Sequence, residues 1–149
     1  MYRHILIASD GSNLAGKGLD AGLALAAALQ ARATLVTASD PWQDVMTADP
    51  SAMALTGELR EERRRQKQAE AEAIFDDARG RAHAAGVGLE TVYVAERLPD
   101  EAILETADSC GADLIVMASH GHRGLRKLLL GSQTQSVVSR SHLPVLVVR

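Results

Sequence analysis

Residues 5–18 read ILIASDGSNLAGKG, and this stretch decides the fold class. Its first part is an unbroken apolar run, typical of a parallel strand that is covered on both faces. The second part, from Gly11, matches the P-loop pattern G-x-x-x-x-G-K-[ST] except at its last position, where Gly18 stands in place of Ser or Thr. The stretch is therefore either a nucleotide-binding P-loop or an ordinary turn from a strand into a helix.

Two features favour the turn. In a P-loop the final hydroxyl is a magnesium ligand, and Gly18 has no side chain to provide one. Ser12 and Asn13 are typical helix caps, so Lys17 would already lie one turn inside the helix. We therefore interpret residues 11–18 as a strand-to-helix turn, with the P-loop as the alternative.

The rest of the chain repeats this alternation of strand and helix. Further apolar runs with strand character begin at residues 33, 89, 113 and 144: ATLVTAS, LETVYVA, DLIVMAS and PVLVVR. Alternating strands and helices indicate right-handed crossovers and an α/β fold with a doubly wound, five-stranded parallel sheet. We expect one domain over residues 1–149.

The segments between these runs have helical periodicity. Three apolar stripes are expected to face the core: Ala15, Leu19, Gly22, Leu23, Ala26 and Leu29; Ala71, Ile74, Ala78, Ala82 and Ala85; and, after Pro99, Ile103, Leu104 and Ala107. The charged run from Glu58 is interpreted as a solvated helix face with weak ion pairs, Glu61 with Arg65 among them. The connection over residues 40–57 is either a mobile lid or a disordered excursion.

Composition excludes several classes of function. The formal net charge of −3 and the 3% content of aromatic residues provide neither the basic excess nor the stacking platforms of a nucleic-acid-binding protein. The single cysteine, Cys110, cannot form an internal disulfide, and no Cys/His spacing resembles a zinc site. The N-terminus is too short and too polar for a signal peptide or a membrane span, so we expect a cytoplasmic protein without a membrane partner.

Two places carry candidate binding residues. Asp10 follows the first strand, where a carboxylate can accept hydrogen bonds from a ribose hydroxyl or act merely as a cap of the next helix. The second place is ASHGHRGLRKLLLGSQTQS, residues 118–136, in which Gly121, Gly124 and Gly131 allow backbone amides to approach an anion. Ser132 and Thr134 add hydroxyl groups, although Ser132 is also a possible helix cap. Cationic side chains lie nearby in the sequence: His122, Arg123, Arg126 and Lys127.

The start ILIASDGS and the end ASHGHRGLRKLLLGSQTQSVVSRSHLPVLVVR resemble the universal stress protein (UspA-like) family, and the resemblance extends over essentially the whole chain. Nucleotide-binding members have the motif G-x2-G-x9-G-[ST]. This chain has Ala118 in place of the first glycine, followed by Gly121, Gly131 and Ser132. The extra methyl group of Ala118 is expected to weaken binding and not to abolish it.

This resemblance implies a Rossmann-like, adenine nucleotide α-hydrolase-like domain with strand order 3-2-1-4-5 that binds ATP, or ADP or AMP. Asp10 would contact the ribose or base, and Ala38 and Met117 would line the adenine pocket. The phosphates would be held by Gly121, Gly131, Ser132 and Thr134, with Mg²⁺ or Mn²⁺ bridging them and no metal ligand from the protein.

The resemblance also implies a homodimer formed by the last strand, Val145 to Val148, since an open sheet edge is a pairing template. We expect a stress-response nucleotide sensor. The alternatives are a slow ATPase or autophosphorylating protein, with Ser132 and Thr134 as acceptors, and a ligand-free dimeric interaction module, which the Ala118 departure favours. No catalytic residue is assigned, because neither His120 nor His122 has a visible partner in the sequence.

Overall fold

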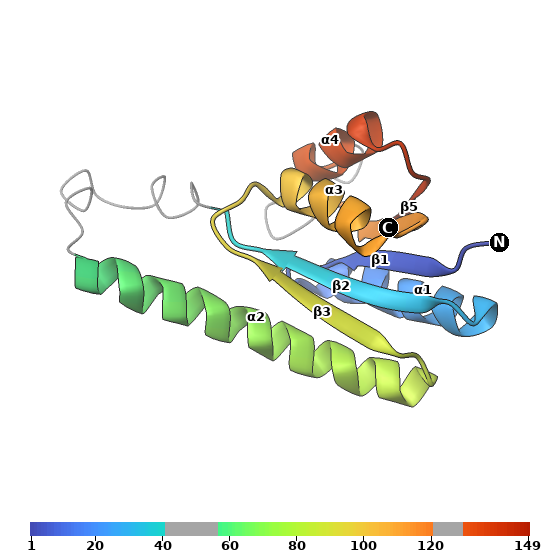
Figure 1. The fold of residues 1–149 in the computed structure, drawn as a ribbon, viewed down its shortest axis with the longest axis horizontal. Coiled ribbons are helices and arrows are strands. Elements are labelled where there is room, and N and C mark those ends of the chain that lie inside the picture. The colour runs from blue at the N-terminus through green and yellow to red at the C-terminus, as the bar shows by residue number, and fades with distance from the viewer. Residues whose placement is uncertain (41–56, 121–129) are drawn as a thin grey trace.

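The computed structural model describes residues 1–40, 57–120 and 130–149 (Figure 1). The remaining segments, 41–56 and 121–129, lie outside the described residues. They include nearly all of the connection over 40–57, the candidate phosphate ligand Gly121, and Gly124 with the four cationic side chains beside it.

One parallel five-stranded sheet forms the centre of the molecule, as the sequence predicts. Its order, β3-β2-β1-β4-β5, confirms the order implied by the family resemblance. The strands are β1 (His4–Ala8), β2 (Arg32–Ala38), β3 (Leu89–Val94), β4 (Leu114–Ala118) and β5 (Val145–Val148). In this arrangement β3 and β5 are the edges, and β1 and β4 are adjacent although more than a hundred residues separate them.

Among the described residues, four helices cover the two faces of the sheet: α1 (Asn13–Leu29), α2 (Gly57–Ala85), α3 (Pro99–Cys110) and α4 (Ser132–Arg140). The side chains of β1 alternate between two cores. Ile5 and Ile7 pack with Leu19 and Leu23 of α1 and with Phe75 of α2. Leu6 and Ala8 pack on the other side, in a second core to which α3 and α4 contribute Ile103, Ala107 and Val137. Helices on both faces confirm the doubly wound architecture.

Helix α2 is the longest element, and only its second half packs on the sheet (Figure 1). Its buried residues are Ala71, Phe75, Ala78 and Ala82. The prediction that Ala85 belongs to this stripe is wrong: Ala85 is the last residue of the helix and is exposed. The charged first turns are mostly exposed, and the predicted pair of Glu61 with Arg65 is present at 4.0 Å, so the interpretation as a solvated face is confirmed.

Asp113 connects β1 and β4 at the amino ends of these two strands, which lie opposite the candidate site. Its carboxylate accepts hydrogen bonds from the backbone amides of Arg3 (2.9 Å) and His4 (3.0 Å), and its own amide donates to the carbonyl of His4 at 2.9 Å. Partial burial acts to raise the pKa of Asp113, but the amide donors outweigh burial and leave that pKa below its usual value. The ionised carboxylate therefore stabilises the contact between β1 and β4.

Replacement of Asp113 by asparagine is expected to lower the free energy of unfolding by about 1 kcal/mol at pH 7, because the amides of Arg3 and His4 lose their charged acceptor and asparagine offers one acceptor oxygen instead of two. A lowered carboxyl pKa contributes stability that is complete above the unfolded value near pH 4 and is lost as the pH falls through the folded value. The difference between the wild type and the variant should therefore shrink as the pH falls from 7 towards about 3.

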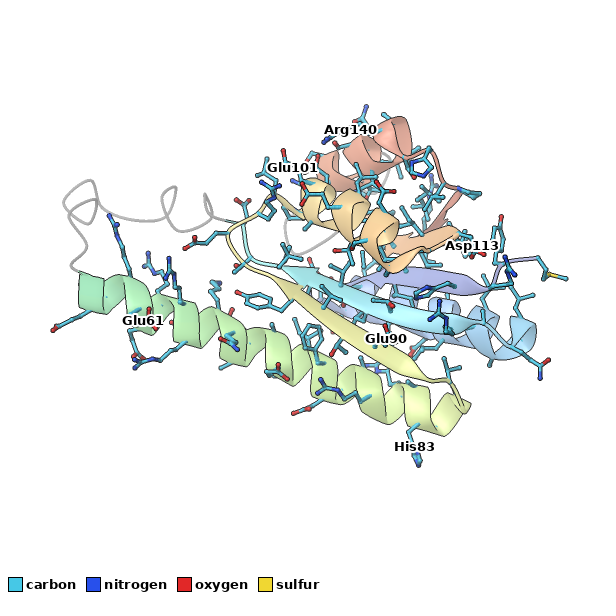
Figure 2. The ribbon with its side chains drawn as sticks, viewed as in Figure 1. Glu61, His83, Glu90, Glu101, Asp113 and Arg140 are labelled. Atoms are coloured by element: carbon cyan, nitrogen blue, oxygen red, sulfur yellow. The ribbon has the colours of Figure 1, made fainter. Side chains whose placement is uncertain are left out.

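Urea unfolding at several pH values measures this difference. The control is Glu90→Gln, which changes an exposed carboxylate on β3 (Figure 2). A constant difference across that pH range would show that the ionised carboxylate of Asp113 has no such role.

Candidate functional site

The candidate site lies where the direction of the chain connections reverses. Helix α1 leads from β1 towards β2, whereas α4 leads from β4 to β5 on the opposite side of the adjacent β1/β4 pair. The carboxyl ends of these strands are level, since Ala8 pairs with both Val36 and Met117. In open parallel sheets the segments that follow strands at such a switch point form the ligand crevice.

The first segment of the crevice, residues 9–13, is a strand-to-helix turn, as predicted. Gly11 has a φ of +79°, a conformation that favours glycine. The Ser12 hydroxyl accepts a hydrogen bond from the amide of Ala15 at 3.2 Å and caps α1, which begins at Asn13. Lys17 and Gly18 lie inside the helix, so this segment does not have the geometry of a P-loop.

Gly18 serves packing instead of phosphate binding. A Cβ atom at Gly18 would lie 3.3 Å from the backbone nitrogen of Ala118, at the end of β4. One turn later, a Cβ atom at Gly22 would lie only 2.7 Å from Cδ1 of Ile7. The two glycines let α1 approach β1 and β4 closely, and that approach places the second turn of α1, at Gly18, beside the end of β4.

Asp10 is half-buried in the turn after β1. Its Oδ1 accepts a hydrogen bond from the amide of Ser12 at 3.0 Å, so the cap-like role considered for it is present. The neighbouring Ser9 carbonyl accepts from the Thr37 hydroxyl at 2.7 Å, which ties this turn to β2. These contacts hold Asp10 near the carboxyl ends of β1 and β2, and its role as a ribose ligand stays a prediction.

The second segment of the crevice is the start of α4. Its N-cap is Gly131, which has no side chain to cap the helix, and Ser132 is the first helical residue. The reading of Ser132 as the cap is therefore wrong, and Ser132 is exposed. The first amides of a helix have no partner within it and carry the positive end of its dipole. Among the described residues, this is the arrangement best suited to an anion.

Gly131 holds this helix start against the end of β4. Its amide donates to the Ser119 carbonyl at 2.8 Å. A Cβ atom at Gly131 would lie 3.2 Å from that carbonyl oxygen and 3.5 Å from Cα of His120. The His120 Nδ1 atom lies 3.1 Å from the Ser119 hydroxyl, a contact that the sequence pattern does not predict.

Thr134 has a different role from the one predicted for its hydroxyl. The side chain is 2% exposed, and its Oγ1 donates to the carbonyls of Ala118 (3.0 Å) and Ser119 (3.2 Å). A hydroxyl has one proton to donate, and here that proton is directed to β4. Thr134 therefore fixes α4 to the end of β4. The hydroxyl that is exposed at the start of the helix is that of Ser132.

The two residues expected around adenine both lie at the carboxyl ends of their strands. Ala38 ends β2 and is half-buried, while Met117 and Ala118 end β4 and are 5% and 7% exposed. Ser39, after Ala38, accepts hydrogen bonds on its hydroxyl from Tyr93 (3.0 Å) and from the amide of Glu96 (3.2 Å), which fixes the loop beside β3. The carboxyl ends of the strands thus bring together residues from four segments of the chain: Asp10, Ala38, Met117 and Gly131. Gly121 lies outside the described residues.

Within residues 1–40, 57–120 and 130–149, no group of three or more His, Cys, Asp or Glu side chains is arranged to hold a metal ion. In the same parts of the chain, no helix combines the length and apolar character needed to cross a membrane.

Comparison with known proteins gives a consistent result. The model of the Universal stress protein family matches residues 1–149. The universal stress protein YxiE of Bacillus subtilis is 32% identical to this chain over 149 residues, which cover 100% of both proteins.

Solved structures share the fold. The structure of MJ0577, a universal stress protein of Methanocaldococcus jannaschii, is similar with a TM-score of 0.79 and 27% identity, over 99% of this chain and 96% of the other. A universal stress protein solved in complex with cAMP has a TM-score of 0.69 and 28% identity, over 99% of this chain and 97% of the other. Adenine nucleotide binding thus occurs in a protein of similar structure.

Proposed function

This chain belongs to the universal stress protein family, and on that premise we propose that it binds an adenine nucleotide, ATP, at the carboxyl edge of its sheet. In this proposal the whole chain acts as one universal stress protein domain. Nucleotide occupancy changes the loops of the crevice, and the protein is a cytoplasmic sensor or switch in a stress response.

The observation that carries this proposal is the start of α4, for which the described part of the chain provides no side-chain cap. Helix α1 is capped by the Ser12 side chain, and the amide of Asp100 in the first turn of α3 donates to Gln133. Helix α4 has no side-chain cap at Gly131, and its exposed first residue, Ser132, lies beside the β1/β4 switch point. Phosphate oxygens would satisfy these amides and interact favourably with the helix dipole.

The remaining candidate residues follow from this placement of the phosphates. The phosphates would be held by Gly131, Ser132 and Gly121. The metal ion, Mg²⁺ or Mn²⁺, would be bound through the phosphates. Asp10 would bind the ribose, while Ala38 and Met117 would contact the base. Ala118 keeps its backbone amide although it replaces the first glycine of the family motif, so we expect weakened binding and not its loss.

The Ala118 departure also supports a second candidate function, a dimeric interaction module that binds no nucleotide. A third candidate, a slow ATPase or autophosphorylating protein, would use the same site. Transfer of radiolabelled γ-phosphate to water or to the protein over hours would favour the enzyme, and retained ATP without such transfer would favour the sensor.

We also propose that the protein is a homodimer in which β5 pairs with β5 of a second copy. This strand is an edge of the sheet, and its Leu146 is 40% exposed. An unpaired edge with exposed apolar side chains is a template for another strand.

Native mass spectrometry of gently purified protein, with and without Mg·ATP, tests the proposal. A mass of two chains with bound ATP, ADP or AMP would support both parts of it. A dimer that stays empty at millimolar Mg·ATP would contradict nucleotide binding and favour the interaction module. A monomer with bound nucleotide would contradict only the dimer.

A further inference from the structure

Helix α4 is held against β4 and α3 largely by polar contacts. Only two of its residues, Thr134 and Val137, are buried, and of these only Val137 is apolar. The hydroxyl of Thr134 fixes one side of the first turn to β4. The orientation of the helix therefore depends strongly on the contacts it makes with α3.

Those contacts converge on Asp100, which is 8% exposed in the first turn of α3. Its carboxylate accepts from the Ser136 hydroxyl at 2.5 Å and from Nη1 of Arg140 at 2.9 Å. Its backbone amide donates to the side-chain oxygen of Gln133 at 3.1 Å. We call Asp100, Gln133, Ser136 and Arg140 the Asp100 cluster.

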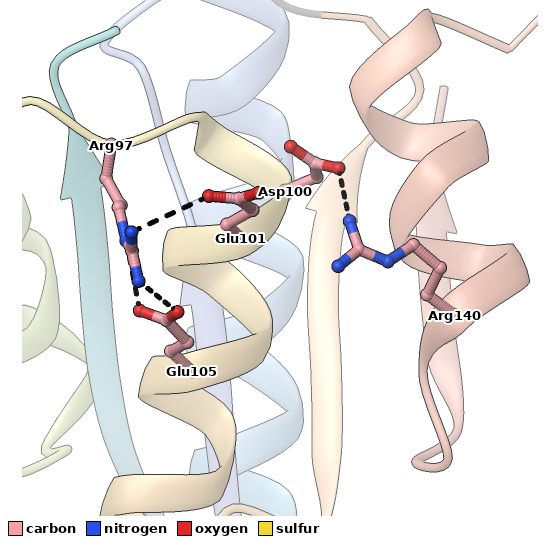
Figure 3. Close-up of polar contacts among 5 residues, drawn as sticks. All are labelled: Arg97, Asp100, Glu101, Glu105 and Arg140. Atoms are coloured by element: carbon pink, nitrogen blue, oxygen red, sulfur yellow. Dashed lines mark hydrogen bonds and ion pairs between the residues drawn. The ribbon is translucent and has the colours of Figure 1, made fainter. Parts of the chain in front are cut away.

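The neighbouring acid in the same turn behaves differently. Glu101 lies beside Arg97, at 3.9 Å, and Arg97 also contacts Glu105 of α3. Figure 3 shows the contrast: Glu101 and Glu105 meet Arg97 on one side of α3, whereas Asp100 is directed across to Arg140 of α4. Of these two acidic residues, it is Asp100 whose carboxylate contacts α4.

We propose that Asp100 is a positioning residue for phosphate binding: through its cluster it holds the first turn of α4 in the orientation that receives the nucleotide phosphates. This inference rests on the proposed function and deepens it. Gln133 makes the link direct, because it is the second residue of α4 and its backbone amide belongs to the first turn of that helix. Hydrogen bonds weaken steeply as angle and distance depart from their optimum, so a small rotation of α4 is expected to reduce phosphate affinity.

The cluster should therefore affect the phosphate part of the ligand and leave the nucleoside part unchanged. The residues assigned to the base, Ala38 and Met117, belong to β2 and β4, and Asp10, assigned to the ribose, belongs to the turn after β1. None of these segments contributes a residue to the Asp100 cluster. ATP and adenosine together separate the two parts of the site.

The experiment is calorimetric titration of ATP and of adenosine into the wild type, Asp100→Asn, Ser136→Ala and the control Glu101→Gln. We expect the Kd for ATP to rise about five- to tenfold in Asp100→Asn and less in Ser136→Ala, with the Kd for adenosine within about twofold of the wild type. Glu101→Gln should leave the ratio of the two affinities unchanged.

Charge alone predicts the opposite sign for Asp100→Asn, because the loss of a carboxylate favours an anionic ligand. Weaker ATP binding in that variant therefore supports positioning. Ser136→Ala alters the cluster without altering charge, and it provides a second test if the Asp100 variant folds poorly. Hydrogen exchange of residues 130–140 in the ligand-free protein should become faster in both variants.

Three outcomes are distinct. If the wild type binds ATP and both cluster variants keep its ratio of ATP to adenosine affinity, this inference is overturned and the proposed function stands. If the affinities for ATP and for adenosine fall equally in the cluster variants, the cluster has only a general structural role, and this inference is also overturned. If the wild type binds neither ligand, the proposed function and the inference fall together.

Discussion

Replacement of Gly131 by valine is expected to weaken ATP binding by about ten- to a hundredfold. The first carbon added at this position would lie 3.2 Å from the Ser119 carbonyl oxygen and 3.5 Å from Cα of His120, both of them backbone atoms. The two further methyl groups of valine must then displace α4 from β4 or extend into the proposed phosphate site. Overpacking of this kind typically costs about 1–3 kcal/mol, which corresponds to the expected loss of affinity.

The matched control is Gly80→Val, on α2. Apart from its chain neighbours and the adjacent backbone of α2, no atom of the described residues lies within 4 Å of a Cβ atom at Gly80, so the same substitution there causes no comparable overlap. Isothermal titration with Mg·ATP compares the two variants with the wild type. Unchanged affinity in Gly131→Val, with binding by the wild type, would mean that the phosphates are bound elsewhere.

Replacement of Ile7 by alanine is expected to lower the free energy of unfolding by about 3 kcal/mol. Ile7 lies in the central strand β1, is 0% exposed, and fills the space that Gly22 leaves between α1 and the sheet. Removing its side chain leaves a cavity that the close-packed helix and strands can fill only in part. For a domain with about 5–15 kcal/mol of stability this is a large loss.

Urea unfolding followed by circular dichroism measures this loss, with Leu59→Ala as the control. Leu59 is 54% exposed at the start of α2, and its replacement should change stability by less than about 0.5 kcal/mol. The double variant Ile7→Ala with Gly22→Ala should be more stable than the sum of the single effects predicts, because the added methyl group enters the vacated space. Strict additivity would contradict the contact between these residues.

Much of the candidate site was predictable because its signals are local in the chain. The cap at Ser12, the start of α4 near Gly131 and the position of Asp10 after the first strand depend on residues within a few positions of one another. The family resemblance added Ala38 and Met117, which lie at the carboxyl ends of β2 and β4. The role of Thr134 was not predictable, because its hydroxyl partners are the carbonyls of Ala118 and Ser119, on a different element.

The sequence by itself determined the strands, the helices, the α/β class and the rejection of a P-loop at residues 11–18, since periodicity, capping and residue type act over one or two turns of chain. The strand order required the family resemblance, because the pattern of elements is the same for several orders. Only the tertiary structure decided that Gly18 and Gly22 serve packing, that the hydroxyl of Thr134 is directed to β4, and that Asp100 and not Glu101 contacts α4. Each of these depends on atoms far apart in the chain, whose distances are set by how helices pack on a sheet.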